Sequence, residues 1–162
     1  MDTKKKILSL KNLKQKLNVL QARGKTIAFT NGCFDILHFG HVSYLQKAKK
    51  NNRILVIGLN SDQSIHKIKG PERPMIGQSY RAALLAALEC VDFVTIFNEE
   101  TPYNVIKTLK PDILIKGEDW KGQEVVGADV VKSYGGKVAY FSYIAECSTT
   151  SIIEKIKHGS NH

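Results

Sequence analysis

Apolar residues recur every three or four positions near the start of the chain. Lysines stand between them, so the pattern predicts an amphipathic helix with one apolar face. The leucines that form this face are Leu10, Leu13, Leu17 and Leu20. Gly24 follows as a stop signal at the helix C-terminus. We therefore divide the chain into an N-terminal helical segment, residues 1–24, and a main domain, residues 25–162.

Short apolar runs alternate with helical patterns from residue 25 onward. The run 53–60 is almost continuously apolar, as expected for a central strand of a parallel sheet. The other expected strands are 26–30, 93–97, 112–116 and 137–141, and the expected helices are 40–50, 79–90, 102–110, 127–134 and 148–157. Ser151 and Glu154 have capping-box spacing, one possible start for the last helix. This order predicts an α/β protein, Rossmann-like, with a parallel sheet of about five strands in three α/β/α layers.

One segment, 67–77, has the composition of a functional loop because it contains two prolines and two glycines. Elsewhere the composition is that of an ordinary globular domain, with 43% hydrophobic and 24% charged residues in 162. No apolar run reaches the roughly 18 residues that span a bilayer. No apolar stretch of signal-peptide length follows the N-terminus. We expect a soluble cytoplasmic protein with no membrane partner.

The cysteines and the charge each bear on the class of function. Cys33, Cys90 and Cys147 form no CxxC pair, so neither a disulfide framework nor a zinc site is indicated. The formal net charge is +9, but the first 25 residues carry eight basic residues and one acidic residue. The rest of the chain is nearly balanced. We interpret the lysines as the solvated face of a helix and expect no nucleic-acid partner; a non-catalytic nucleic-acid or partner-binding module is the alternative.

The turn after the first strand is the strongest candidate for chemistry. Ligands bind at the carboxyl ends of parallel strands, and the helix that follows presents free backbone N–H groups there. Gly40 would let a phosphate approach the backbone. His38 and His41 lie on the same side of the helix start, an arrangement suited to a polyphosphate. Histidines at this spacing could also be structural, or half of a metal site, although no third ligand is spaced for zinc.

Several sequence blocks resemble one enzyme family. Gly32–Asp35 followed by His38–His41 resembles the GxFD…HxGH signature of the cytidylyltransferase-like nucleotidyltransferases. The chain resembles most closely those members that make ADP-heptose, in blocks that run in the family's order from about residue 24 to the C-terminus. These blocks are 30–45, 60–62, 69–74, 81–92, 116–119, 126–129 and 147–150.

The resemblance implies transfer of AMP from ATP to a heptose 1-phosphate with release of pyrophosphate, for lipopolysaccharide or other heptose-containing glycans. Mg²⁺ is expected with ATP, and no dedicated carboxylate cage is visible for it. Many relatives also contain a sugar kinase. This chain has no room for one, so we expect a separate kinase to supply the substrate. The family also implies a homo-oligomer.

The resemblance also implies roles for individual residues. His38 and His41 would stabilise the transition state, and Lys47 could reach the triphosphate or simply be solvated. Asp35 could orient a phosphate-binding group, assist Mg²⁺ or tie the turn together. Trp120 could pack or stack. The expected nucleotide-binding residues are Thr30, Asn31, Gly32, Cys33, Phe34, Gly40, Arg81, Lys116, Gly117, Asp119, Ser148, Thr149 and Thr150. The expected substrate-binding residues are Asp35, Asn60, Asp62, Lys69 and Arg73.

The nearest alternative within the family is a glycerol-3-phosphate cytidylyltransferase. Those enzymes have an arginine before the last helix, and the stretch 143–148 has none; Glu89 also stands where they tend to have a basic residue. Class I aminoacyl-tRNA synthetases share an HFGH-like tetrapeptide, but 162 residues cannot hold one. Phosphopantetheine adenylyltransferases lack the Cys-Phe-Asp and Cys-Ser-Thr-Thr blocks. ATP and a heptose 1-phosphate therefore remain the expected substrates.

Overall fold

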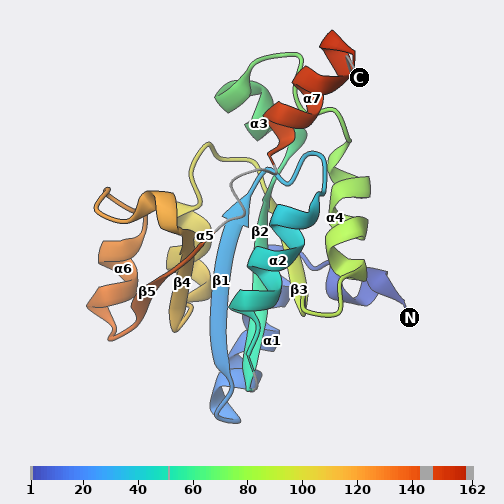
Figure 1. Cartoon of the computed structure of the whole chain (residues 1–162). Helices are drawn as coiled ribbons and strands as arrows, with labels where there is room; N and C mark the ends of the chain where they lie inside the picture. Colours follow the sequence, from blue (N-terminus) through green and yellow to red (C-terminus); the bar gives the residue numbers. More distant parts are fainter. Residues whose placement is uncertain (1, 51, 143–147, 160–162) are drawn as a thin grey trace.

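The computed structural model describes residues 2–50, 52–142 and 148–159. All five strands run parallel in one sheet, with the order β3-β2-β1-β4-β5 (Figure 1). The expected α/β fold is thereby confirmed. The strands are β1 (Thr26–Gly32), β2 (Arg53–Asn60), β3 (Phe93–Phe97), β4 (Ile113–Gly117) and β5 (Lys137–Phe141).

Helices cover both faces of the sheet. Helices α2 and α4 pack on one face, and α1, α5 and α6 pack on the other, while α3 and α7 lie beyond the carboxyl ends of the strands (Figure 1). The α-helices are α1 (Leu10–Ala22), α2 (Phe39–Ala48), α3 (Asp62–Lys69), α4 (Gln78–Ala87), α5 (Tyr103–Leu109), α6 (Ala128–Ser133) and α7 (Thr149–His158). The 3₁₀ helices are η1 (Thr3–Lys6) and η2 (Glu118–Trp120).

The first strand divides the core because its side chains alternate between the two faces. Ala28 belongs to the apolar cluster under α2 and α4. Ile27 and Phe29 belong to the cluster under α1, α5 and α6. All three are fully buried, so this strand is fixed in register between two packed layers.

One expected loop begins with a helix, and the last helix starts where its expected range 148–157 places it. Helix α3 occupies the start of the segment that we expected to be a loop, so the loop itself is 70–77. Ser61 caps this helix by accepting a hydrogen bond from the Ser64 amide at 3.1 Å. The last helix begins with a capping box between Ser148 and Ser151, three residues ahead of the alternative start at Ser151.

The basic N-terminal segment packs against the rest of the domain. Leu13 and Leu17 on α1 are fully buried. Lys6 donates hydrogen bonds to two carbonyls that follow α4, those of Leu88 (3.1 Å) and Val91 (2.7 Å). The C-terminus of α4 is a favourable place for a cation. The charge of Lys6 therefore stabilises the fold.

The chain just after η1 adds to the outer edge of β3. Ile7 forms an isolated parallel bridge with Val94, and the Leu8 amide donates to the Val94 carbonyl at 3.0 Å. Across the described ranges, no helix is long and apolar enough to cross a membrane.

Candidate active site

A cavity of about 430 Å³ opens at the carboxyl ends of β1, β2 and β4. Because β2 and β4 flank β1 on opposite sides, the cavity lies where the strand order reverses, the usual ligand position in open parallel sheets. The expected residues that line it are Thr30, Asn31, Gly32, Cys33, Phe34, Asp35, His41, Asn60, Lys69, Arg73, Lys116, Gly117 and Thr149. The expected residues outside its lining are His38, Gly40, Lys47, Asp62, Arg81, Asp119, Ser148 and Thr150.

The β1–α2 turn has a tight backbone. Phe34 adopts a left-handed φ of 44°, and its ring lies against Gly32, where a Cβ atom would come within 3.0 Å of Phe34 Cε2. A side chain at position 32 would therefore have to displace the Phe34 ring. The turn delivers the chain into α2 with His38 as the N-cap residue, which makes no side-chain capping bond. The first N–H groups of α2 therefore lie beside the cavity.

The two histidines of the turn form a stacked pair. Their ring centroids are 3.8 Å apart and their planes differ by 24°. Burial, together with the charge of His38, lowers the pKa of His41 to about 4, and burial also lowers the pKa of His38. Both Nδ1 atoms are buried with no hydrogen-bond partner among the residues described. Near pH 7 the pair is therefore neutral, and an anion that binds there would favour its protonation.

Asp35 fastens the loop 70–77 to this turn. Its carboxylate is almost fully buried and accepts three hydrogen bonds from the loop. Arg73 Nε donates to Oδ2 at 2.6 Å, and the amides of Met75 and Ile76 donate to Oδ1 at 2.7 and 3.0 Å. Both carboxylate oxygens are thus used within the protein. Of the three roles expected for Asp35, the geometry favours holding the turn and orienting Arg73.

Arg81 supports the same loop from behind. Its guanidinium is fully buried, donates to the carbonyls of Ile76 (2.8 Å) and Cys33, and pairs with Asp62 Oδ1 at 2.7 Å. All its donor nitrogens therefore have protein partners, and it does not line the cavity. Arg81 and Asp62 thus form a supporting network beside the cavity, and their contacts with nucleotide and substrate stay predictions.

A buried lysine lies on the β4 side of the cavity. Lys116 Nζ donates to Asn31 Oδ1 at 2.6 Å and lies 5.5 Å from the centroid of the Trp120 ring. Burial lowers the pKa of Lys116 to about 8, although the nearby charge of Asp119 opposes the shift. The ammonium stays mainly protonated at pH 7. It is a cation suited to an anionic or strongly polar ligand group.

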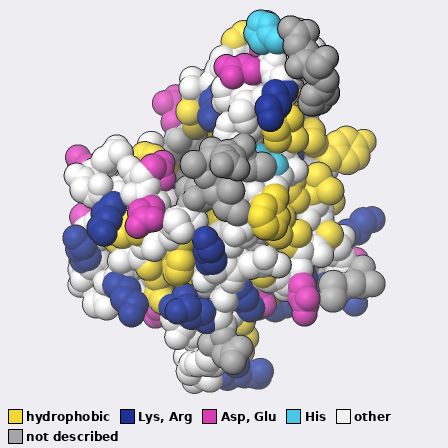
Figure 2. Space-filling model, viewed as in Figure 1, with side chains coloured by type: hydrophobic (Ala, Val, Ile, Leu, Met, Phe, Trp, Pro, Cys, Tyr) yellow, Lys and Arg dark blue, Asp and Glu magenta, His cyan; other side chains and the backbone are white. Residues whose placement is uncertain are grey.

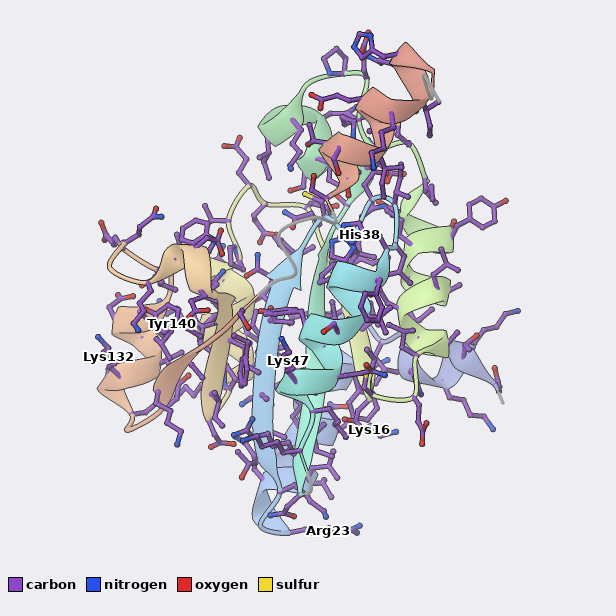
Figure 3. The ribbon with its side chains drawn as sticks, in the orientation of Figure 1. Lys16, Arg23, His38, Lys47, Lys132 and Tyr140 are labelled. Atoms are coloured by element: carbon purple, nitrogen blue, oxygen red, sulfur yellow. The ribbon has the colours of Figure 1, made fainter. Side chains whose placement is uncertain are left out.

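The remaining expected residues are less central. Lys47 lies on α2 farther from the strand ends than His38 (Figure 3), and its Nζ donates to Ser142 Oγ at 3.2 Å. Ser148 caps α7, and Thr149 in its first turn lines the cavity. The stretch 143–147, including Cys147, lies outside the described residues. Within the described part of the chain, no group of three or more His, Cys, Asp or Glu residues could hold a metal ion.

Sequence reasoning missed part of the cavity wall. Tyr44 lines it, and its hydroxyl lies 2.8 Å from Thr30 Oγ1. Other lining residues without an expected role are Ile68, Glu100, Thr101, Pro102 and Val126. Residues 100–102 follow the carboxyl end of β3, and that position was the one signal that could have identified them.

Comparisons with known proteins identify the family of the chain. The family model described as cytidylyltransferase-like matches residues 29–155. The bifunctional protein HldE of Geotalea uraniireducens (strain Rf4) is 53% identical over 98% of this chain and 32% of its own length. The bifunctional protein HldE of Campylobacter fetus subsp. fetus (strain 82-40) is 56% identical over 94% of this chain and 32% of its own length. The chain spans about a third of the length of these curated relatives.

A solved structure is similar in fold. It is the crystal structure of the lipopolysaccharide core biosynthesis protein from Thermoplasma volcanium GSS1, with a TM-score of 0.58 and 29% sequence identity. The similarity covers 73% of this chain and 95% of that one.

Proposed function

The chain belongs to the cytidylyltransferase-like family, and on that premise we propose that it transfers AMP from ATP to a heptose 1-phosphate, giving ADP-heptose and pyrophosphate. The observation that carries this proposal is the cavity at the strand-order reversal. His41 of the stacked histidine pair lines it at the start of α2, and two cations, Lys69 and Arg73, also line it. A site with positive groups on more than one wall suits two phosphorylated substrates.

The reaction needs charge stabilisation more than proton abstraction. An oxygen of the sugar phosphate attacks the α-phosphorus of ATP and forms the new P–O bond. The bond from the α-phosphorus to the bridging oxygen breaks, and pyrophosphate leaves with the electron pair. The attacking oxygen is already anionic near neutral pH, so alignment and cationic groups determine the rate. We assign this stabilisation to His38 and His41, which are neutral in the free protein and gain proton affinity beside the phosphates.

The two substrates have separate sides in this proposal. The nucleotide would use the N-termini of α2 and α7, with Lys116, Gly117 and Thr149 on the β4 side. The acceptor phosphate would use Lys69 and Arg73. Mg²⁺ would enter with ATP and would neutralise part of the phosphate charge. We do not assign Asp35 to it, because both oxygens of that carboxylate already accept hydrogen bonds from the loop.

We also propose the partners that this chemistry requires. A sugar kinase has to make the heptose 1-phosphate, and we expect it to act as a separate unit in the cytoplasm. Self-association is supported by an apolar surface over α2 and α4 (Figure 2), where Phe39, Tyr80 and Leu84 are exposed by 64%, 73% and 44%. We propose no membrane or nucleic-acid partner for this activity.

The proposal is tested by a pyrophosphate-release assay that crosses four nucleoside triphosphates with several sugar 1-phosphates and glycerol 3-phosphate. We expect release only with ATP and a heptose 1-phosphate. CTP with glycerol 3-phosphate as the productive pair would overturn the proposed substrates. His41→Ala should lower kcat on the order of 10²-fold, by analogy with loss of one transition-state donor. His66→Ala, on the exposed side of α3, is the matched control and should retain activity.

A further inference from the structure

Asn60 is a buried carboxamide at the edge of the cavity. It is the last residue of β2, is 4% exposed and lines the cavity. Its Nδ2 atom donates to Ser64 Oγ at 2.9 Å. No partner is found for Oδ1 in the described parts of the chain, so Oδ1 is the atom left for a ligand.

The neighbouring hydrogen bonds determine which way the carboxamide points. Ser64 Oγ lies 2.7 Å from the main-chain carbonyl oxygen of Glu99. A carbonyl can only accept, so the single hydroxyl proton of Ser64 is donated to it. Ser64 Oγ is then an acceptor toward Asn60, which must present its NH₂ group to Ser64. The chain Asn60–Ser64–Glu99 therefore fixes Oδ1 as the atom available to the cavity.

The carboxyl end of the adjacent strand β1 offers a hydrogen-bond donor instead of an acceptor. Asn31, on β1, accepts from Lys116 through its Oδ1, so its NH₂ group is the part left for a ligand. The cavity thus offers a hydrogen-bond acceptor on the β2 side and donors on the β1 and β4 sides. A phosphate oxygen would be repelled by Asn60 Oδ1, whereas a hydroxyl or amino group would bind it.

We propose that Asn60 Oδ1 accepts a hydrogen bond from a hydroxyl group of the sugar acceptor, and that Ser64 is the positioning residue that holds the carboxamide in this orientation. This inference rests on the proposed function. Hydroxyl and amino groups of ATP share the same donor chemistry. The sugar is favoured because Asn60 ends β2, the strand that leads into α3 and Lys69, whereas Lys116 and Trp120 belong to β4 and η2 on the other side of β1.

The test combines variants with acceptors that lack one hydroxyl each. The full chain is assayed for pyrophosphate release with ATP and a heptose 1-phosphate, and then with singly deoxygenated sugar 1-phosphates. In the wild type, one deoxy acceptor should lose about tenfold in kcat/KM, the value of one hydrogen bond in the site. Asn60→Ala should lose about tenfold with the full acceptor and be insensitive to that one deoxygenation.

Ser64→Ala tests the positioning role because it removes no group that contacts the ligand. It should raise the KM for the acceptor, leave the KM for ATP unchanged and weaken the discrimination against the deoxy acceptor. Ser133→Ala is the matched control: its hydroxyl also donates to a carbonyl, that of Val130 at 2.7 Å, but on α6 away from the cavity. Its kinetic constants should equal those of the wild type.

The outcomes separate this inference from the proposed function. A wild type that is inactive with every sugar 1-phosphate would overturn the proposed function, and this inference with it. An active wild type whose variants change only the KM for ATP would place the donor on the nucleotide and overturn the sugar assignment. Equal discrimination against every deoxy acceptor in the wild type and in Asn60→Ala would overturn the role of Asn60.

Discussion

Replacing Asp35 by asparagine isolates one part of the contact between the β1–α2 turn and the loop 70–77. Asparagine keeps an oxygen at Oδ1, so the amides of Met75 and Ile76 can still donate to it. At the other position an NH₂ group replaces Oδ2 and faces Arg73 Nε, which is also a donor. The substitution therefore removes the ion pair and leaves one guanidinium N–H without its acceptor.

The expected cost follows from the burial of the two partners. Breaking a fully buried ion pair by removing one partner costs about 3–5 kcal/mol, and losing a hydrogen bond to a charged group costs about 1.5–3 kcal/mol. The Asp35 side chain is 1% exposed, but that of Arg73 is 17% exposed, so water can hydrate part of the released guanidinium. We therefore expect Asp35→Asn to lower the free energy of unfolding by about 2 kcal/mol.

Urea denaturation followed by circular dichroism measures this loss. With an m-value of about 2 kcal/mol per molar, the midpoint should fall by about 1 M. The KM for the acceptor should also rise, because Arg73 is no longer held in place, while the KM for ATP stays near the wild-type value. Asp92→Asn is the matched control. Asp92 also accepts from a backbone amide, that of Leu55 at 2.6 Å, and pairs with Lys49, away from the cavity.

Two results would refute this reasoning. A loss below about 0.5 kcal/mol would mean that the buried pair does not stabilise the loop. A loss of the expected size with an unchanged acceptor KM would mean that Asp35 has a structural role only.

Three further predictions concern protonation and the core. Because the pKa of His41 is about 4 in the folded protein and about 6.5 in the unfolded chain, the unfolded state binds more protons between these values. Stability should therefore fall as pH drops from 6.5 toward 4, and His41→Ala should reduce that fall in thermal melts. The KM for the ligand anion beside Lys116 should rise as pH increases through about 8, where the ammonium deprotonates, and Lys116→Met should lose this dependence. Leu17→Ala should cost about 2–5 kcal/mol in urea denaturation, since Leu17 is fully buried in the core.

The sheet was predictable from the sequence because its strands are apolar and are separated by helical periodicity. The expected strands 53–60, 93–97 and 137–141 match β2, β3 and β5 at both ends. Helix α3 was not predicted. Among its eight residues only Ile65 and Ile68 are apolar, so it lacks a strong periodic signal, and Ser61 was the one start signal available.

The candidate site was predictable only in part. The histidine pair and the β1–α2 turn lie within one short stretch of sequence, and the resemblance drew attention to that stretch. Asp35 bonds to Arg73, 38 residues away along the chain, and Arg81 bonds to the Cys33 carbonyl, 48 residues away. Spacing rules describe neighbours within a helix or strand. They could not show that Asp35 bonds to the loop 70–77, or that Arg81 bonds to that loop and to the β1–α2 turn. Direct ligand contacts and supporting roles were therefore indistinguishable before the fold was known.

The bridge between Ile7 and Val94 has a practical consequence for handling the protein. Ile7 and Leu8 shield the outer edge of β3, where the Val94 carbonyl would otherwise face solvent. Exposed strand edges recruit strands from other molecules. A shortened chain that starts at Ser9 would retain α1 yet lose this cover, and it should aggregate more readily on concentration than the full-length chain.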